Sequence, residues 1–458
     1  MLRNFALAGW LGLALNAATA RAAEPLRTVG EISADIAVGR FQGSVCISNW
    51  PAQARGAFVL NAGLNVARIT DASGKALDFG GLYDGAADGE GRVYTVATPF
   101  PATLCVSYVG AFPVYPAHDA PTDFKGLIAF NGDSVRASEQ AVWLPTPFDA
   151  RARTRIGDTA YDLKVSCAGC QMIYVNGSPP STGGAGRFVS AAPRPPLLFG
   201  GTGPSANGGG LTFVNVAPGP ETAAALAGAF KDFRGFYAGY MGRGFEDTPT
   251  LLRMIALDQA ERDLHGSSWG FASWPTIALA GAGIDGLGAG LRSHAQKDEW
   301  VLAYLSHETA HYYFGHLNAP TGRFTWLLTE STAEFLSIKA QTALAGPDAA
   351  ARHIGKLVAA FDKHGPYPPL DTIAKSEEIT PDYRYNYGPL LLLSLERAVG
   401  PQKMQAFVRT LFAAPSPQSW DELAALAGRA GIGTDVWRDW RATCVTDAPK
   451  ACIDGLAH

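Results

Sequence analysis

The sequence predicts an α+β protein of more than one domain, with an N-terminal antiparallel β saddle or sandwich followed by a mainly helical part. Two patterns predict it. Short runs of alternating apolar and polar residues fill residues 23–215, and apolar residues three and four positions apart dominate residues 216–458. The length of 458 residues suits two or three domains of about 100–200 residues each. We therefore predict one domain over each of these two segments.

The first 22 residues have the pattern of an export signal. Arg3 supplies a positive charge, residues 5–15 are mostly apolar, and the small residues of 18–22 suit a cleavage site. The apolar run is shorter than the roughly 20 residues that a membrane span needs. We expect a signal peptide over residues 1–22, no stable membrane anchor after its cleavage, and an exported protein, either periplasmic or secreted.

Six cysteines agree with an oxidising compartment, where an even number usually pairs. Cys444 and Cys452 are close in sequence and are expected to form one bridge. Cys46 and Cys105 lie in the same β-rich segment and are candidates for a second. The Cys-Ala-Gly-Cys sequence at 167–170 has the spacing of a redox or zinc pair, but its strand-loop context favours a small turn disulfide.

The β-rich segment contains its clearest alternation at residues 91–97, 102–109 and 161–166, with turn-forming Gly, Pro, Asn and Asp between the runs. Several short strands at this spacing are typical of an antiparallel sandwich or a saddle-shaped sheet. The glycine-rich stretch at 200–210 is expected to be a loop near the domain boundary.

The second segment has the periodicity of helices. Two strands are predicted there, at 251–257 and 276–280. The predicted helices are 221–241, 298–316, 325–344, 349–364, 388–399, 402–412 and 420–430.

The formal net charge of −4 gives no basic surface of the kind that binds nucleic acid. We therefore predict no nucleic-acid partner. The sequence does not indicate an oligomeric state.

The strongest chemical signal is His307-Glu308-Thr309-Ala310-His311. On a helix, two histidines four positions apart project from one face and can both bind Zn²⁺, and Glu308 lies beside them as a candidate general base. Glu330 follows His311 after an interval of eighteen residues and supplies a third ligand. Two His and one Glu leave an open position, as in a catalytic zinc site.

These residues resemble the aminopeptidase N family of gluzincin zinc metallopeptidases, which includes leukotriene A4 hydrolase. His-Tyr-Tyr-Phe-Gly at 311–315 is similar to the family's H-x-W-F-G. Trp-Leu-Leu-Thr-Glu-Ser-Thr-Ala at 326–333 is similar to its W-L-N-E-G-x-A, with Glu330 at the ligand position. Tyr-Asn-Tyr-Gly at 385–388, followed by a Leu-rich helix, is similar to its Y-x-K-G.

The resemblance implies a thermolysin-like, mainly helical catalytic domain over 216–458, a Zn²⁺ cofactor and a peptide substrate. It gives Tyr385 the role of donating a hydrogen bond to the oxyanion, a role for which a phenol is chemically suited. Tyr383 and Tyr387 are close enough in sequence to remain alternatives. The resemblance covers most of the chain after residue 22, but the family's large C-terminal helical domain is expected to be largely missing.

The chain departs from the family at the motif that binds the substrate's free amine, G-x-M-E-N. The corresponding residues 270–274 are Gly-Phe-Ala-Ser-Trp, which contain no carboxylate. Glu246, Asp258 and Glu261 are possible substitutes. An aminopeptidase-like activity is therefore predicted, with three alternatives left open: an endopeptidase, a non-peptide hydrolase on the same zinc site, and a non-catalytic, zinc-stabilised binding protein.

Two polar residues near the motif each have two interpretations. Glu334 lies one helical turn after Glu330, so it can orient a ligand histidine or be a solvated surface carboxylate. His316 is interpreted as a polar residue at the end of a helix in preference to a fourth ligand.

Two short motifs match other chemistries but lack the right context. Gly-Ser-Ser-Trp-Gly at 266–270 fits a serine nucleophile elbow, yet no apolar strand precedes it. Gly-Ala-Gly-Ile-Asp-Gly at 281–286 fits a dinucleotide-binding loop, yet further glycines follow it where a helix should begin. We predict a mobile loop there.

Overall fold

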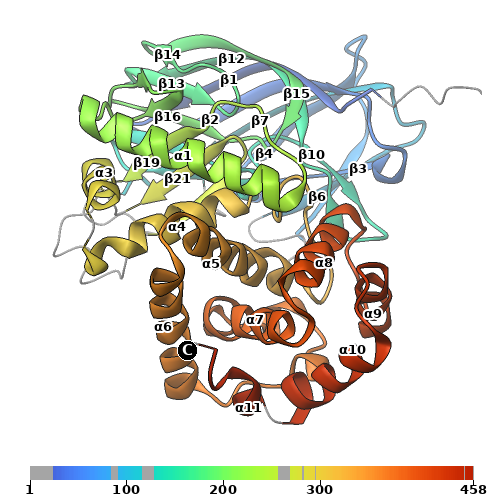
Figure 1. The fold of residues 1–458 in the computed structure, drawn as a ribbon. Helices are drawn as coiled ribbons and strands as arrows, with labels where there is room; N and C mark the ends of the chain where they lie inside the picture. Colours follow the sequence, from blue (N-terminus) through green and yellow to red (C-terminus); the bar gives the residue numbers. More distant parts are fainter. Residues whose placement is uncertain are drawn as a thin grey trace, which may run out of the picture.

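The computed structural model describes residues 24–83, 91–115, 128–255, 269–280, 283–293, 295–447 and 449–456. The predicted signal peptide at 1–22 lies outside these residues. Strands make up most of the N-terminal half of the molecule and helices most of the C-terminal half, with helix α1 lying against the strands (Figure 1). The predicted α+β class and the order of its two parts are confirmed.

The largest sheet has six strands in the order β15-β12-β1-β2-β7-β4. Neighbouring strands in this sheet are antiparallel, except for β1 and β12, which are parallel to each other. One side chain in two is buried along most of β2 and β7, as the alternating sequence predicts. The strands are β1 (Arg27–Asp35), β2 (Arg40–Ser48), β4 (Asn65–Asp71), β7 (Thr103–Ala111), β12 (Thr159–Ala168) and β15 (Ala185–Arg194).

Two five-stranded sheets complete the N-terminal part, in the orders β11-β10-β3-β6-β5 and β14-β13-β16-β9-β8. Large side chains such as Phe41, Trp143, Tyr161 and Phe188 are fully buried in its core. The strands are β3 (Ala57–Asn61), β5 (Phe79–Tyr83), β6 (Gly91–Val96), β8 (Ile128–Phe130), β9 (Ser134–Ala137), β10 (Thr146–Asp149), β11 (Thr154–Arg155), β13 (Met172–Val175), β14 (Ser181–Thr182) and β16 (Leu198–Gly201).

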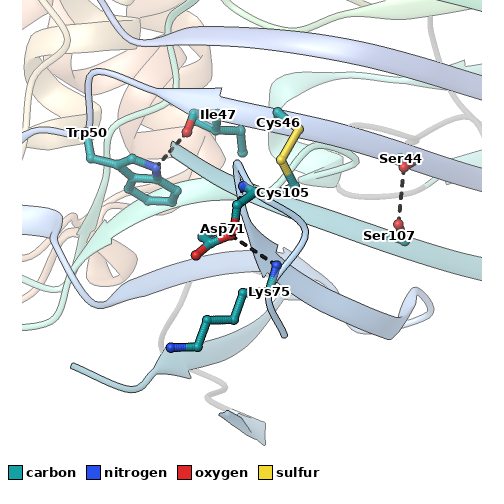
Figure 2. The surroundings of a disulfide bond; sticks show 9 residues. Ser44, Cys46, Ile47, Trp50, Asp71, Lys75, Cys105 and Ser107 are labelled. Atoms are coloured by element: carbon teal, nitrogen blue, oxygen red, sulfur yellow. Dashed lines mark hydrogen bonds between the residues drawn. A yellow bond between two sulfur atoms is a disulfide. The ribbon is translucent and has the colours of Figure 1, made fainter. Parts of the chain in front are cut away.

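A disulfide joins two neighbouring strands of the six-stranded sheet. Cys46 on β2 and Cys105 on β7 are directly opposite in the ladder, and the next pair on the same face is Ser44 and Ser107, whose hydroxyls are 3.1 Å apart (Figure 2). This bridge closes a loop with a sequence separation of 59. The structure also contains the other two expected bridges, Cys167–Cys170 and Cys444–Cys452.

A fourth sheet, in the order β17-β18-β19-β21-β20, carries the helical part. Strands β18, β19 and β21 are parallel, and β20 pairs antiparallel with β21 at the edge. Because β18 and β19 lie on either side of residue 215, strands from both sides of the predicted boundary share one sheet, and the boundary stays a prediction. The strands are β17 (Ala206–Gly208), β18 (Leu211–Val214), β19 (Thr250–Ile255), β20 (Trp269–Ser273) and β21 (Thr276–Ala280).

The helices surround a single large apolar core. Most predicted helices occur within a few residues of their expected bounds, but the helix predicted for 298–316 ends at Ala310. The helices are α1 (Pro220–Met241), α3 (Ile284–Arg292), α4 (Glu299–Ala310), α5 (Thr332–Leu344), α6 (Pro347–His364), α7 (Gly388–Val399), α8 (Pro401–Ala413), α9 (Trp420–Arg429), α10 (Thr434–Trp440) and α11 (Pro449–Ile453), with π-helical turns η4 (Leu327–Ser331), η7 (Tyr383–Tyr387) and η8 (Arg441–Asp447). Among the described residues, none of the helices combines the length and the hydrophobicity that a membrane span needs.

The prediction of a mobile loop at residues 281–286 is wrong for the residues that the structure describes, because α3 begins at Ile284. Its glycines allow close packing. A Cβ at Gly288 would lie 2.6 Å from the Thr222 side chain of α1, and one at Gly290 would lie 2.5 Å from Val301 of α4. The serine of the elbow-like motif, Ser268, lies outside the described residues.

Candidate metal centre

Helix α4 carries the His-Glu-x-x-His sequence at its C-terminal end. His307 and His311 are 8% and 9% exposed, and their Nε2 atoms are 3.1 Å apart. Glu330 lies on the π-helical turn η4, with Oε2 3.5 Å from His307 Nε2 and 3.3 Å from His311 Nε2. Within the described part of the chain, these three are the one group of at least three His, Cys, Asp or Glu residues that could hold a metal ion.

The three separations fit a tetrahedral zinc ion. Zinc–ligand bonds of about 2.0–2.1 Å at tetrahedral angles place neighbouring ligand atoms roughly 3.3 Å apart. The observed separations of 3.1, 3.3 and 3.5 Å lie around that value. Two imidazole nitrogens and one carboxylate oxygen also form a donor set that zinc commonly uses.

Each ligand histidine is held at its other ring nitrogen. His307 Nδ1 is 2.6 Å from Glu334 Oε2, and His311 Nδ1 is 3.2 Å from the main-chain oxygen of Phe314. When both Nδ1 atoms donate in this way, both Nε2 lone pairs are available to bind a metal ion. The side chain of Glu334 is only 12% exposed, so it is not a solvated surface carboxylate.

The carboxylates of this group stay ionised despite their burial. Burial raises the pKa of Glu330, but His311 and His307 outweigh it and leave that pKa well below its usual range. Burial likewise opposes ionisation of Glu334, and hydrogen bonds from His307 and His353 lower its pKa. Negative charge is thus fixed around the point that the three ligand atoms face, as a divalent cation requires.

Glu308 lies next to the ligands, between α4 and the edge strand β20. It is 5% exposed. A Cβ at Gly270 of β20 would lie 3.1 Å from the Glu308 carboxyl group and 2.5 Å from the hydroxyl of Tyr304. The carboxyl group of Glu308 is therefore packed against the backbone of β20.

Tyr385 reaches the same site from the π-helical turn η7. Its ring is 6.0 Å from the His307 ring, and its side chain lines the cleft. Burial, and then the charges of Glu330 and Glu308, raise the pKa of the Tyr385 phenol, so it stays protonated and able to donate. Tyr383 and Tyr387 are fully buried and pack against each other, with ring centres 4.8 Å apart.

A cleft of about 630 Å³ lies over the ligands. The N-terminal part contributes Glu139 and Gln140 from the short turn η2 (Glu139–Ala141). The rest of the lining comes from β20, α4 and the turn after it, η4, α5, α6 and η7. The other lining residues are Gly270, Phe271, Ala272, Trp300, Ala303, Tyr304, His307, Glu308, His311, Gly315, His316, Trp326, Thr329, Glu330, Glu334, His353 and Tyr385.

Four residues considered in the sequence analysis, one as a metal ligand and three as amine-binding groups, are not shown in those positions. His316 lines the cleft, but its Nε2 donates to the main-chain oxygen of Ala272 at 2.8 Å, and it is not in the ligand group. Glu246 is exposed and does not line the cleft. Asp258 and Glu261 lie outside the described residues.

Two cleft residues, Glu139 and His353, were not predicted from the sequence. Glu139 Oε2 accepts a hydrogen bond from Ser273 Oγ at 3.0 Å, and His353 Nε2 lies 2.7 Å from Glu334 Oε1. Neither belongs to a motif identified in the sequence, and only the packing of the folded chain brings them to the cleft.

No protein-family profile and no curated protein matches the chain. The fold is similar to that of solved metallopeptidases. Yeast LTA4 hydrolase in complex with bestatin aligns with a TM-score of 0.64 and 15% identity, covering 91% of this chain and 67% of the other. An M1 zinc metallopeptidase from Deinococcus radiodurans aligns with a TM-score of 0.58 and 15% identity, covering 91% and 93%. A mutant of that enzyme bound to a Tyr-Ser-Ala substrate gives 0.57 and 15%, covering 91% and 94%. At this identity the similarity establishes a shared fold.

Proposed function

We propose that this protein is a zinc-dependent metallopeptidase. The observation that carries the proposal is the arrangement of His307, His311 and Glu330, whose ligand atoms are spaced as tetrahedral zinc requires, beside the buried carboxyl group of Glu308. The similarity in fold to zinc metallopeptidases supports the same conclusion. Zinc in such a site supplies Lewis-acid chemistry, because it polarises a carbonyl group and makes water a stronger nucleophile.

The residues around the cleft have complementary tasks in peptide hydrolysis. Glu308 takes a proton from the attacking water and passes it to the leaving amine, so no net proton stays on the enzyme. Tyr385 donates a hydrogen bond to the carbonyl oxygen as that oxygen gains negative charge. The walls contributed by β20 and η2 hold the peptide in position for attack.

An aminopeptidase needs a group that binds the ammonium of the substrate, and we propose Glu139 for this task. Ser273 occupies the position at which the aminopeptidase N family, which this sequence resembles, has the Glu of its G-x-M-E-N motif. Glu139 reaches this place from the N-terminal part, because its carboxylate accepts the Ser273 hydroxyl at 3.0 Å and lines the cleft. A carboxylate thus lies beside the edge strand although residues 270–274 carry none.

The test is a digest of a mixed peptide library with free and blocked N-termini, read by mass spectrometry. We expect loss of single N-terminal residues from the free peptides only. The Glu308→Gln variant should still bind zinc, but its rate of hydrolysis should be at least about 10²-fold lower. The same variant is the control for a contaminating peptidase, whose activity the substitution would not reduce. Internal cuts would indicate an endopeptidase, and no cleavage by zinc-loaded protein would contradict a peptidase.

Glu139→Gln separates the amine-binding proposal from the hydrolytic one. An ammonium–carboxylate hydrogen bond contributes about 1.5–3 kcal/mol, so kcat/KM for free peptides should fall roughly 10- to 100-fold. Zinc content should not change. An unchanged kcat/KM for free peptides would remove Glu139 from substrate recognition.

We propose further that the protein acts outside the cytoplasm. Three disulfides support this location, because such bonds persist in oxidising compartments. Detection of a mature N-terminus near residue 22 in the periplasmic or secreted fraction would test it, and an uncleaved protein in the cytoplasm would contradict it.

A further inference from the structure

The carboxylate that orients His307, that of Glu334, also contacts a histidine outside the ligand group. Glu334, in the first turn of α5, uses one oxygen for each of two histidines. Oε2 is 2.6 Å from His307 Nδ1, and Oε1 is 2.7 Å from His353 Nε2. His353 comes from α6, which packs against α5, and its side chain lines the cleft at 18% exposure.

The surroundings of His353 fix which of its nitrogens carries hydrogen. The amide nitrogen of Gln341 is 2.7 Å from His353 Nδ1 and 3.4 Å from the main-chain oxygen of Ser337. Because this NH₂ group donates in both directions, His353 Nδ1 accepts. His353 Nε2 therefore carries the hydrogen and donates it to Glu334.

The two ligand histidines are thus oriented by different means. His311 is held by a main-chain oxygen, that of Phe314, whose position follows from the backbone. His307 is held by Glu334, a flexible side chain on another helix. The second contact, to His353, keeps this carboxylate from rotating away from His307.

We propose that His353 is a positioning residue of the metal centre: it holds Glu334, and Glu334 holds His307 with its Nε2 directed at the metal. This inference rests on the proposed zinc site. His353 does not touch the metal position itself. Loss of the hydrogen-bond partner of a metal ligand typically weakens metal binding about 10- to 100-fold, and loss of His353 acts through Glu334, which is such a partner.

Two substitutions of similar chemistry separate the contact with Glu334 from packing. The amide of His353→Gln reaches about as far as histidine Nε2, so it can still donate to Glu334. The amide of His353→Asn is too short for that but can keep the contact with Gln341. His364→Asn, an exposed histidine at the end of the same helix, is the matched control.

The measurement is the zinc dissociation constant, obtained by competition with a chromophoric chelator, together with the melting temperature of the metal-free proteins. We expect His353→Asn to bind zinc about 10- to 100-fold more weakly, and His353→Gln and His364→Asn to bind it within a few-fold of the wild type. A purely structural histidine would lower the metal-free melting temperature without this difference between Asn and Gln.

Equal zinc affinity in the wild type and His353→Asn would overturn the proposal, and so would equal weakening by Asn and Gln. Absence of zinc affinity in the folded wild type would instead contradict the proposed function, and that result is read from the wild type alone.

Discussion

At the residue scale, Tyr385 differs from its two neighbouring tyrosines by what its hydroxyl can reach. Tyr385 lines the cleft beside His307. The hydroxyls of Tyr383 and Tyr387 are buried and have no hydrogen-bond partner among the described residues. Of these three tyrosines, Tyr385 is the one that lines the cleft, as its proposed role requires.

Tyr385→Phe should lower kcat about 10²- to 10³-fold and leave KM nearly unchanged, because the lost hydrogen bond forms mainly in the transition state. Steady-state kinetics on a free peptide measures both. Tyr387→Phe is the matched control and should keep wild-type kcat. Equal effects of the two variants would remove Tyr385 from the mechanism.

The grouping of the three candidate ligands could be predicted from the sequence because their geometry is local. A helix brings His307 and His311 onto one face whatever the rest of the fold does, and the interval to Glu330 completed the group. Glu139 and His353 could not be predicted, since only tertiary packing brings them to the cleft.

At the element scale, two π-helical turns carry residues of the proposed site. Glu330 lies in η4 and Tyr385 in η7, where the sequence predicts ordinary helix or leaves the segment unassigned. A π turn inserts a residue into the helical repeat and often occurs at functional sites. Hydrophobic periodicity does not reveal such an insertion, because the flanking residues keep the helical pattern.

A prediction at the element scale concerns the edge strand β20. Gly270→Ala would put a Cβ 2.5 Å from the Tyr304 hydroxyl and 3.1 Å from the Glu308 carboxyl group. Displacement of Glu308 by a fraction of an ångström should lower kcat/KM at least about 10-fold, with zinc content unchanged.

Gly235→Ala in α1 is the control, because a Cβ there meets nothing within 4 Å. This variant should keep full activity and gain stability of about 0.5–1 kcal/mol. Full activity of Gly270→Ala, measured on the same peptide, would show that the contact between β20 and Glu308 does not position the carboxylate.

At the scale of the whole molecule, a buried polar network joins the β-rich part to the sheet of the helical part. Asn176 is fully buried, donates to the main-chain oxygens of Pro195 and Trp274, and accepts from Thr276 at 2.7 Å. Tyr174 contacts the same threonine at 2.6 Å. The sequence predicted both parts, but such contacts between distant polar residues leave no periodic pattern from which their packing could be predicted.

Asn176→Ala should lower the free energy of unfolding by about 1–3 kcal/mol for each buried partner left unsatisfied. Differential scanning calorimetry should show a lower melting temperature. Asn207→Ala, at an exposed asparagine of β17, should change it little. An unchanged melting temperature for Asn176→Ala would mean that this network does not stabilise the junction.

The zinc content of the purified, folded protein tests the central claim most directly, with Glu330→Ala measured in parallel. Elemental analysis should find about one zinc per wild-type chain and much less in the variant, which keeps only two of the three ligands. A folded wild-type protein that neither contains zinc nor takes it up would contradict a zinc peptidase built on His307, His311 and Glu330.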